Sequence, residues 1–247
     1  MRKRLLSLVL VLLLLGLTVT AAFAQTYRFQ VPKEVVNYYI NADGTASVAY
    51  WIDFTNDPSA SPIDYVDVGV PTDNYDLSSI TAEVDGKPIT DIQKSEYVKP
   101  GVALGLGANS IPPGGSGQVY VWIPVIRDVV YPSNKSGEEN YASFQFSPNY
   151  FGSQYVSGRT DLTLTLILPP GMTEDQPRYY PPENWPGSSE PNESGIQDNR
   201  VYYTWQSASA DASSKYVFGG GFPKEFVPAD TIRTTPTINL PSFDLTG

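Results

Sequence analysis

The chain has 247 residues, 26 acidic against 16 basic side chains, and a formal net charge of −10 at pH 7. Such an acidic surface repels nucleic acid and anionic lipid headgroups, so we expect neither as a partner. The sequence contains no histidine and no cysteine, which excludes Ser-His-Asp triads, cysteine nucleophiles, zinc held by imidazole, and disulfides. The composition therefore favours a protein that is not an enzyme and has no cofactor.

The first 24 residues predict export from the cytoplasm. Three basic residues at positions 2–4 precede an apolar run at 5–19, and the stretch ends in Ala22-Phe23-Ala24. This order is typical of a secretory signal peptide cut after Ala24. The alternative is an uncleaved anchor, because a membrane-spanning helix needs only ~20 apolar residues. We expect the cleaved chain to be secreted or held in the cell envelope, with no membrane span of its own.

From residue 25 onward the hydrophobic pattern repeats every second residue, which indicates β-strands with one buried face. In chain order, strands are predicted at about 34–40, 46–54, 64–70, 80–84, 102–106, 118–125, 141–147, 162–168, 201–206 and 215–219. Roughly ten short strands separated by turns predict an all-β fold, an antiparallel β-sandwich of immunoglobulin-like size or larger.

Turn residues support these boundaries. Asp85-Gly86 separates two apolar runs and is typical of a two-residue hairpin, where glycine supplies the positive φ. Residues 41–44, Asn-Ala-Asp-Gly, predict another hairpin. Pro88 lacks an N–H for the ladder, so its strand should lie at a sheet edge.

The domain limits follow from composition. Residues 25–227 are expected to form one sandwich domain, and the alternative is two sandwiches divided near residue 126. Residues 228–247 are rich in Thr, Pro and Ser without alternation. They predict an extended, poorly ordered tail.

Residues 106–125, LGANSIPPGGSGQVYVWIPV, carry a family resemblance together with INADGTASVAYWIDF at 40–54, VDGKPI at 84–89 and LTLTLILPPGM at 162–172. The layout over about 35–172 resembles uncharacterised bacterial secreted or membrane-anchored proteins with an extracytoplasmic immunoglobulin-like β-sandwich. The resemblance implies a cell-envelope setting and supplies no catalytic residue.

Two aromatic loops are the candidate ligand-binding segments. Tyrosine and tryptophan on a rigid loop offer large contact areas at low entropic cost. The alternative is that the rings fold back and fill gaps at the end of the sandwich. The candidate residues are Tyr179, Tyr180 and Trp185 in one loop and Tyr150, Phe151 and Tyr155 in the other.

Carboxylates offer two further hypotheses. A pair flanking a sugar bond could hydrolyse it, with candidates Glu83, Glu96, Glu138, Glu139, Glu174 and Glu183, but no spacing marks out a catalytic pair. The loop at 41–44 and the aspartates between 53 and 76 could hold a structural calcium ion, although Asn and Asp are also ordinary turn residues. No residue is assigned as a metal ligand.

The sequence thus favours a non-catalytic interaction or structural module of the bacterial cell envelope, whose partner is an envelope protein or a polysaccharide. The first alternative is a carbohydrate-binding module that uses the aromatic loops. A glycan-active enzyme with a carboxylate pair is the least favoured.

Overall fold

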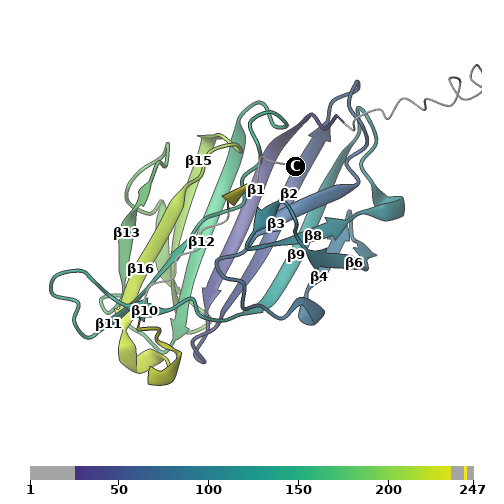
Figure 1. Ribbon diagram of the computed structural model, residues 1–247. Coiled ribbons are helices and arrows are strands. Elements are labelled where there is room, and N and C mark those ends of the chain that lie inside the picture. Colours follow the sequence, from purple (N-terminus) through teal and green to yellow (C-terminus); the bar gives the residue numbers. More distant parts are fainter. Residues whose placement is uncertain (1–25, 235–241, 244–247) are drawn as a thin grey trace, which may run out of the picture.

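The computed structural model describes residues 26–234 and 242–243, so the predicted signal peptide lies outside the described residues. One large sheet of eight strands forms the first layer (Figure 1), in the order β14-β15-β12-β1-β2-β9-β4-β5. Its strands are β1 (Phe29–Ile40), β2 (Ala46–Asn56), β4 (Thr81–Val84), β5 (Lys87–Ile89), β9 (Ser116–Ile126), β12 (Thr160–Pro170), β14 (Glu193–Gln197) and β15 (Arg200–Ala210).

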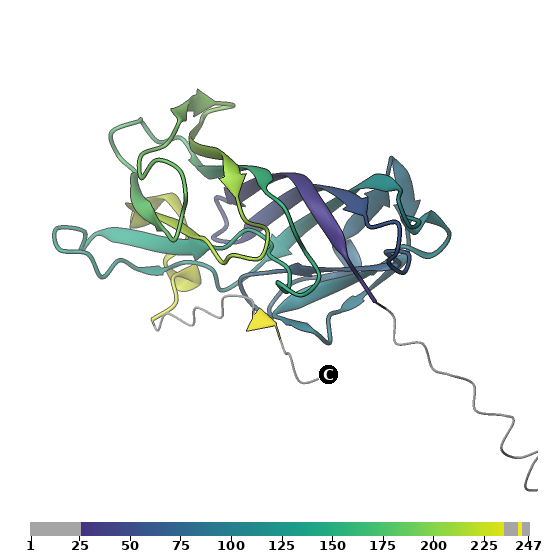
Figure 2. The same ribbon diagram turned by 90° about the horizontal axis from the view of Figure 1, so that it is seen from above.

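The second layer consists of two shorter sheets that lie on the same side of the long strands (Figure 2). One has the order β10-β11-β16-β13 and the other β3-β8-β6. Their strands are β3 (Tyr65–Gly69), β6 (Asp91–Lys94), β8 (Gly101–Gly105), β10 (Tyr131–Pro132), β11 (Tyr141–Phe146), β13 (Arg178–Glu183) and β16 (Val217–Pro223). A small ladder pairs β7 (Val98–Lys99) with β17 (Ser242–Phe243). The predicted all-β sandwich is confirmed.

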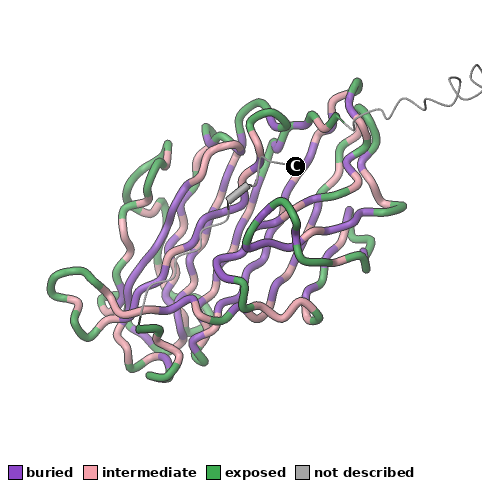
Figure 3. Tube along the Cα trace, in the orientation of Figure 1, coloured by how far each residue is buried: buried purple, intermediate pink, exposed green. Residues whose placement is uncertain are grey.

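The core lies between the two layers because each long strand buries alternate residues (Figure 3). Tyr38 of β1 is fully buried and stacks on Phe146 of β11 at 4.2 Å between ring centroids. Trp205 of β15 packs on Phe218 of β16 at 5.4 Å. These contacts join the large sheet to the four-stranded sheet, and the hydroxyl of Tyr50 joins it to the three-stranded one by donating to the Gly69 carbonyl.

One pairing departs from the expected antiparallel pattern. β1 runs parallel to β12, with Val36 opposite Leu164 and Tyr38 opposite Leu166. All other strand pairs in the described residues are antiparallel. Sequence periodicity is the same for both directions, so it cannot reveal this pairing. Because β1 and β12 are neighbours, the large sheet takes strands from both sides of residue 126.

The hairpin and edge predictions are confirmed. Asp85 and Gly86 have φ values of 50° and 74° and join β4 to β5. Pro88 lies in β5, the edge strand of the large sheet. The described helices are single 3₁₀ turns at Leu77–Ser79, Gly107–Asn109, Lys224–Phe226 and Ala229–Thr231. No helix in the described part of the chain is long and apolar enough to cross a membrane.

The start of the predicted tail differs from expectation. Residues 229–231 form a 3₁₀ turn instead of an extended segment. The backbone N–H of Arg233 donates to the Val130 carbonyl, and its guanidinium pairs with Asp128 at 2.6 Å. The side chain of Thr231 contacts the site where Gly44 lacks a Cβ. Residues 228–234 are therefore packed against the sandwich, and residues 235–241 and 244–247 lie outside the described residues.

A carboxylic acid occupies an inward position of β1. Glu34 is fully buried, and neither carboxyl oxygen makes a hydrogen bond of good geometry with the described residues. Burial raises the pKa of Glu34 to about 8, and the nearby Asn149 backbone offsets a smaller part. An unpaired buried carboxylate is costly, so Glu34 should be neutral at pH 7.

Candidate functional site

On the outward face of the three-stranded sheet, the central strand carries only small side chains. β8 has the sequence Gly-Val-Ala-Leu-Gly, and it buries Val102 and Leu104 against the core. Strand alternation therefore turns its small residues, at positions 101, 103 and 105, to the other face. Side chains of the flanking strands β3 and β6 rise on each side, because Tyr65 and Asp91 both pair with Gly105.

A groove of about 710 Å³ covers this face and continues to the loop that follows β11. Four tyrosines line it, Tyr27, Tyr65, Tyr97 and Tyr155, and we call it the tyrosine groove. Their exposed fractions are 52% for Tyr65, 57% for Tyr97 and 42% for Tyr155. These are three of the four exposed large hydrophobic side chains of the described residues, and the fourth is Ile196 at the other end of the large sheet.

The loop wall of the groove is fixed to the start of β1. The backbone N–H of Phe29 donates to the Tyr155 carbonyl at 2.9 Å. Phe151 packs edge-on against Phe29 at 5.3 Å and against Phe54 at 5.6 Å. The rings of Tyr27 and Tyr155 also meet edge-on, at 6.3 Å. Aromatic packing beneath the loop therefore holds Tyr155 in place.

Hydrogen bonds fix the other wall. The hydroxyl of Ser95 donates to Asp67 and accepts the backbone N–H groups of Tyr97 and Val98, at 3.1 and 2.8 Å. One side chain thus positions both Asp67 and the turn that carries Tyr97. Burial raises the pKa of Asp67, and the bond from Ser95 partly offsets this.

The groove also contains hydrogen-bonding groups around the rings. Asp91 accepts from the side-chain amide of Gln93 at 2.6 Å, while the hydroxyl of Tyr65 lies at the long distance of 3.5 Å from it. Tyr27 donates to Asp64 at 2.5 Å. Glu96, Lys94 and Gln154 complete the polar lining. Exposed rings surrounded by carboxylates, amides and one ammonium group can bind a small ligand that has both apolar and hydrogen-bonding surfaces.

The structure places the predicted aromatic residues in different settings. Phe151 and Tyr155 line the tyrosine groove. Tyr150 lies beside them, partly buried, and burial raises its pKa. Tyr179 packs edge-on against Tyr203 and Trp205 at 5.4 and 5.9 Å. The two loops therefore do not form a common surface.

Trp185 packs edge-on against Tyr216 and Phe218 at 5.3 and 5.2 Å. Its indole nitrogen is buried without a hydrogen-bond partner in the described residues. Trp185 is nevertheless only partly buried as a whole. The contacts show a ring that fills space beside the core.

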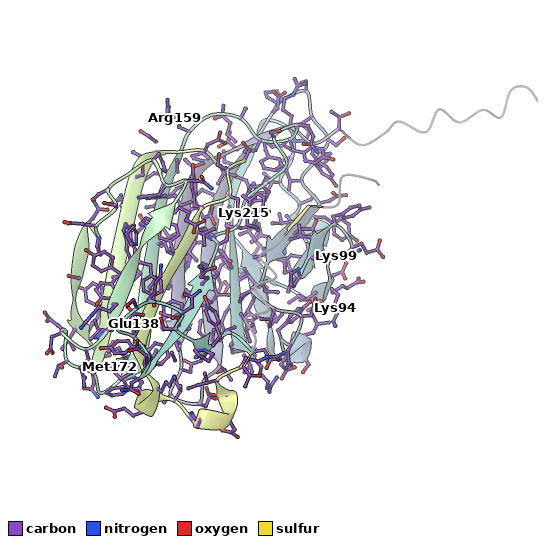
Figure 4. All side chains as sticks on the ribbon, turned by 60° about the vertical axis from the view of Figure 1, so that its left-hand side comes forward. Lys94, Lys99, Glu138, Arg159, Met172 and Lys215 are labelled. Atoms are coloured by element: carbon purple, nitrogen blue, oxygen red, sulfur yellow. The ribbon has the colours of Figure 1, made fainter. Side chains whose placement is uncertain are left out.

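Tyr180 belongs to a polar cluster at the end of the four-stranded sheet. Its hydroxyl donates to Glu138 at 2.6 Å and lies 3.0 Å from the Ser143 hydroxyl. Ser133 also donates to Glu138, and Lys135 lies over the Tyr180 ring at 4.8 Å. Glu138 and the groove residue Lys94 are far apart, near opposite sides of the view in Figure 4.

The aspartates considered for calcium serve turns and the groove. Asp57 accepts from the hydroxyl of Ser59, and Asp76 from that of Ser78. These bonds lower the pKa of both carboxyl groups. Asp64 and Asp67 belong to the groove region. Within the described ranges, no three acidic side chains come close enough together to hold a metal ion.

Sequence reasoning missed Tyr27, Tyr65 and Tyr97. Tyr27 precedes β1, Tyr65 begins β3 and Tyr97 lies in the turn between β6 and β7, so the groove forms only when these segments meet. The available signal was the alternation of small residues in β8, since glycine and alanine on an outward face leave room between the larger side chains of the neighbouring strands.

No protein-family model matches the sequence, and no curated protein matches it. Among solved structures, the chain is similar to a mutant of the M1 zinc metallopeptidase from Deinococcus radiodurans, at 9% identity and a TM-score of 0.49, over 79% of this chain and 43% of that one. The unmutated peptidase gives 8% identity and a TM-score of 0.47, over 80% of this chain and 43% of that one. The chain spans less than half the length of these structures. Similarity at this level transfers no activity.

Proposed function

We propose that the chain is a non-catalytic interaction module of the bacterial cell envelope, and that its ligand is a carbohydrate held in the tyrosine groove. The envelope setting rests on the predicted signal peptide. The carrying observation is that Tyr65, Tyr97 and Tyr155, all exposed, meet in one groove. Exposing the apolar surface of three large rings to water is unfavourable in free energy, and binding an apolar surface of a ligand would offset this.

The chemistry of the lining favours a sugar. A sugar ring has a face of C–H groups that packs on an aromatic ring, and a rim of hydroxyls that needs donors and acceptors. Asp91, Gln93 and Gln154 supply these groups beside the tyrosines. The groove volume lies within the usual ~300–1,000 Å³ of ligand sites, which suits a short segment of a glycan.

The test is binding to a panel of soluble polysaccharides by affinity electrophoresis, followed by calorimetry on any glycan retained. Tyr97→Ala and Tyr155→Ala should each weaken binding about tenfold, which corresponds to about 1.4 kcal/mol. Ile196→Ala removes an equally exposed side chain outside the groove and should leave binding unchanged.

Two results would contradict the proposal. The first is that no glycan in the panel is retained. The second is retention that both tyrosine variants preserve in full. If Trp185→Ala alone abolished retention while the fold stayed intact, the other aromatic loop would be the ligand site.

A further inference from the structure

The large sheet has an outer face, turned away from the short sheets, that carries an uncharged patch. Strand register aligns its side chains in three rows across β12, β1, β2 and β9. The first row is Thr163, Val35, Trp51 and Tyr120; the second is Thr165, Asn37, Ala49 and Trp122; the third is Ile167, Tyr39 and Ser47. We call these residues the outer patch. None of them is charged, in a chain with 42 charged side chains.

The patch is aromatic at its centre and partly exposed to solvent. Trp51 and Tyr120 pack together at 5.1 Å, and Tyr39 meets Trp122 edge-on at 5.9 Å. All of its members except Ser47 and Ala49 are partly exposed. A shallow hollow of about 280 Å³ lies on this face beside Trp51. A small ligand could not be enclosed there, so the face suits a large, flat partner.

Charged groups of both signs surround the patch. Lys33 lies in the adjoining row, between Asp161 and Asp53. Glu83 pairs with Tyr120 from the next strand, and Arg200 lies 5.8 Å from the Tyr39 ring centre. A charge-depleted aromatic centre with a charged rim is the anatomy of a protein–protein interface.

We infer that the outer patch is the interface of a homodimer. Elsewhere two copies of this acidic chain repel each other, and the patch is where they can approach without like charges meeting. Twisted sheets pack face to face readily, and the bulky Trp51 of the first row lies two residues from the small Ala49 of the second row on β2, so one copy can interdigitate with another. Because the rim contains acidic and basic side chains, acidic groups of one copy can also pair with basic groups of the other across a twofold axis.

The patch has the size of the centre of a dimer interface. The 11 residues of the patch, on strands about 4.8 Å apart and in rows about 6.8 Å apart, cover about 360 Å² in projection. A stable interface buries about 800 Å² on each partner, and the patch would form its centre with the charged rim around it.

The arrangement has a functional consequence, which rests on the proposed function. The tyrosine groove lies on the opposite side of the sandwich from the outer patch, so dimerisation leaves both grooves free and facing away from each other. Two grooves on one particle would bind a repetitive glycan with higher avidity than one.

Sedimentation velocity of the purified protein, over a micromolar to submillimolar series, tests the inference. We expect the wild type to reach twice the mass of one chain. Trp51→Lys and Thr163→Lys place a charge in the patch and should weaken dimerisation by at least about tenfold. Tyr97→Lys places the same charge in the groove and should leave the dimer intact.

A wild type that stays at the mass of one chain throughout the series overturns the inference. It is also overturned if Trp51→Lys and Thr163→Lys, both with wild-type circular dichroism, dimerise as the wild type does. Thr163→Lys decides alone if the tryptophan variant fails to fold. Because mass is measured without glycan, failure here is distinct from failure of the groove to bind a sugar.

Discussion

Replacing Glu34 with glutamine should remove a pH dependence of stability that the wild type carries between about pH 4.5 and 8. In the unfolded chain the carboxyl group ionises near its ordinary pKa of 4.5, whereas burial holds the folded pKa at about 8. Between these values the unfolded state has lost the proton that the folded state keeps, so stability falls as pH rises. Below the lower value both states are protonated and the effect vanishes.

The size of the effect follows from the two pKa values. Each pH unit in the window costs about 1.4 kcal/mol. Across the whole interval from 4.5 to 8 the loss is about 5 kcal/mol, and at pH 7 it is about 3 kcal/mol. For a domain of this size, 1 kcal/mol corresponds to about 2–4 °C in melting temperature.

The assay is urea unfolding of wild type and Glu34→Gln at several pH values from 4 to 9. Other titrating groups contribute equally to both proteins, so the difference between them isolates Glu34. We expect the variant to gain stability relative to the wild type by about 1.4 kcal/mol per pH unit up to about pH 8. A difference that stays constant with pH would refute the reasoning, because Glu34 would then have the same pKa in both states.

Three further substitutions test the packing. Gly101→Ala should destabilise the fold by about 1–3 kcal/mol in a thermal melt, because the new Cβ would meet the backbone carbonyl of Val98. In Gly105→Ala the new Cβ meets the side chain of Asp91 instead, so this variant should lose less stability, while it narrows the groove and weakens glycan binding. Equal losses of stability in the two variants would contradict this. Trp185→Ala should lower stability by about 2–4 kcal/mol through lost ring contacts and leave groove binding unchanged, and a loss of binding without destabilisation would show the opposite role. Arg233→Ala removes a partly exposed ion pair and should change stability by less than about 1 kcal/mol in urea unfolding, so a larger loss would indicate that residues 228–234 anchor the fold.

The long strands could be predicted because one side of each is buried. β2, β9 and β12 alternate clearly, and their predicted limits differ from the observed ones by a few residues. The short strands β6 and β14 could not be predicted because they expose most of their residues and so show no apolar period. β7 has only two residues, which is too short for a period to appear. β13, Arg178–Glu183, is a strand where the sequence predicts a loop, because its two prolines are unfavourable in a strand.

The groove was only partly predictable. Phe151 and Tyr155 were singled out because aromatic residues crowd a glycine-containing loop, and both line the groove. Tyr65 and Tyr97 are separated from that loop in sequence, and only the tertiary arrangement brings them together. Alternation places Glu34 in phase with the buried residues Val36, Tyr38 and Ile40. Its burial was still not predicted, because Glu34 is the first residue of the predicted strand 34–40, where a carboxylate fits an exposed strand end, whereas β1 begins at Phe29.

The most direct test of the central claim is an NMR titration of the protein carrying ring-labelled tyrosine with a glycan retained in the binding panel. The account predicts saturable shifts of the Tyr65, Tyr97 and Tyr155 ring signals, assigned through Tyr→Phe variants, with Tyr179 and Tyr180 unaffected. Saturable shifts confined to Tyr179 and Tyr180, or none in the three groove tyrosines at saturation, would contradict it.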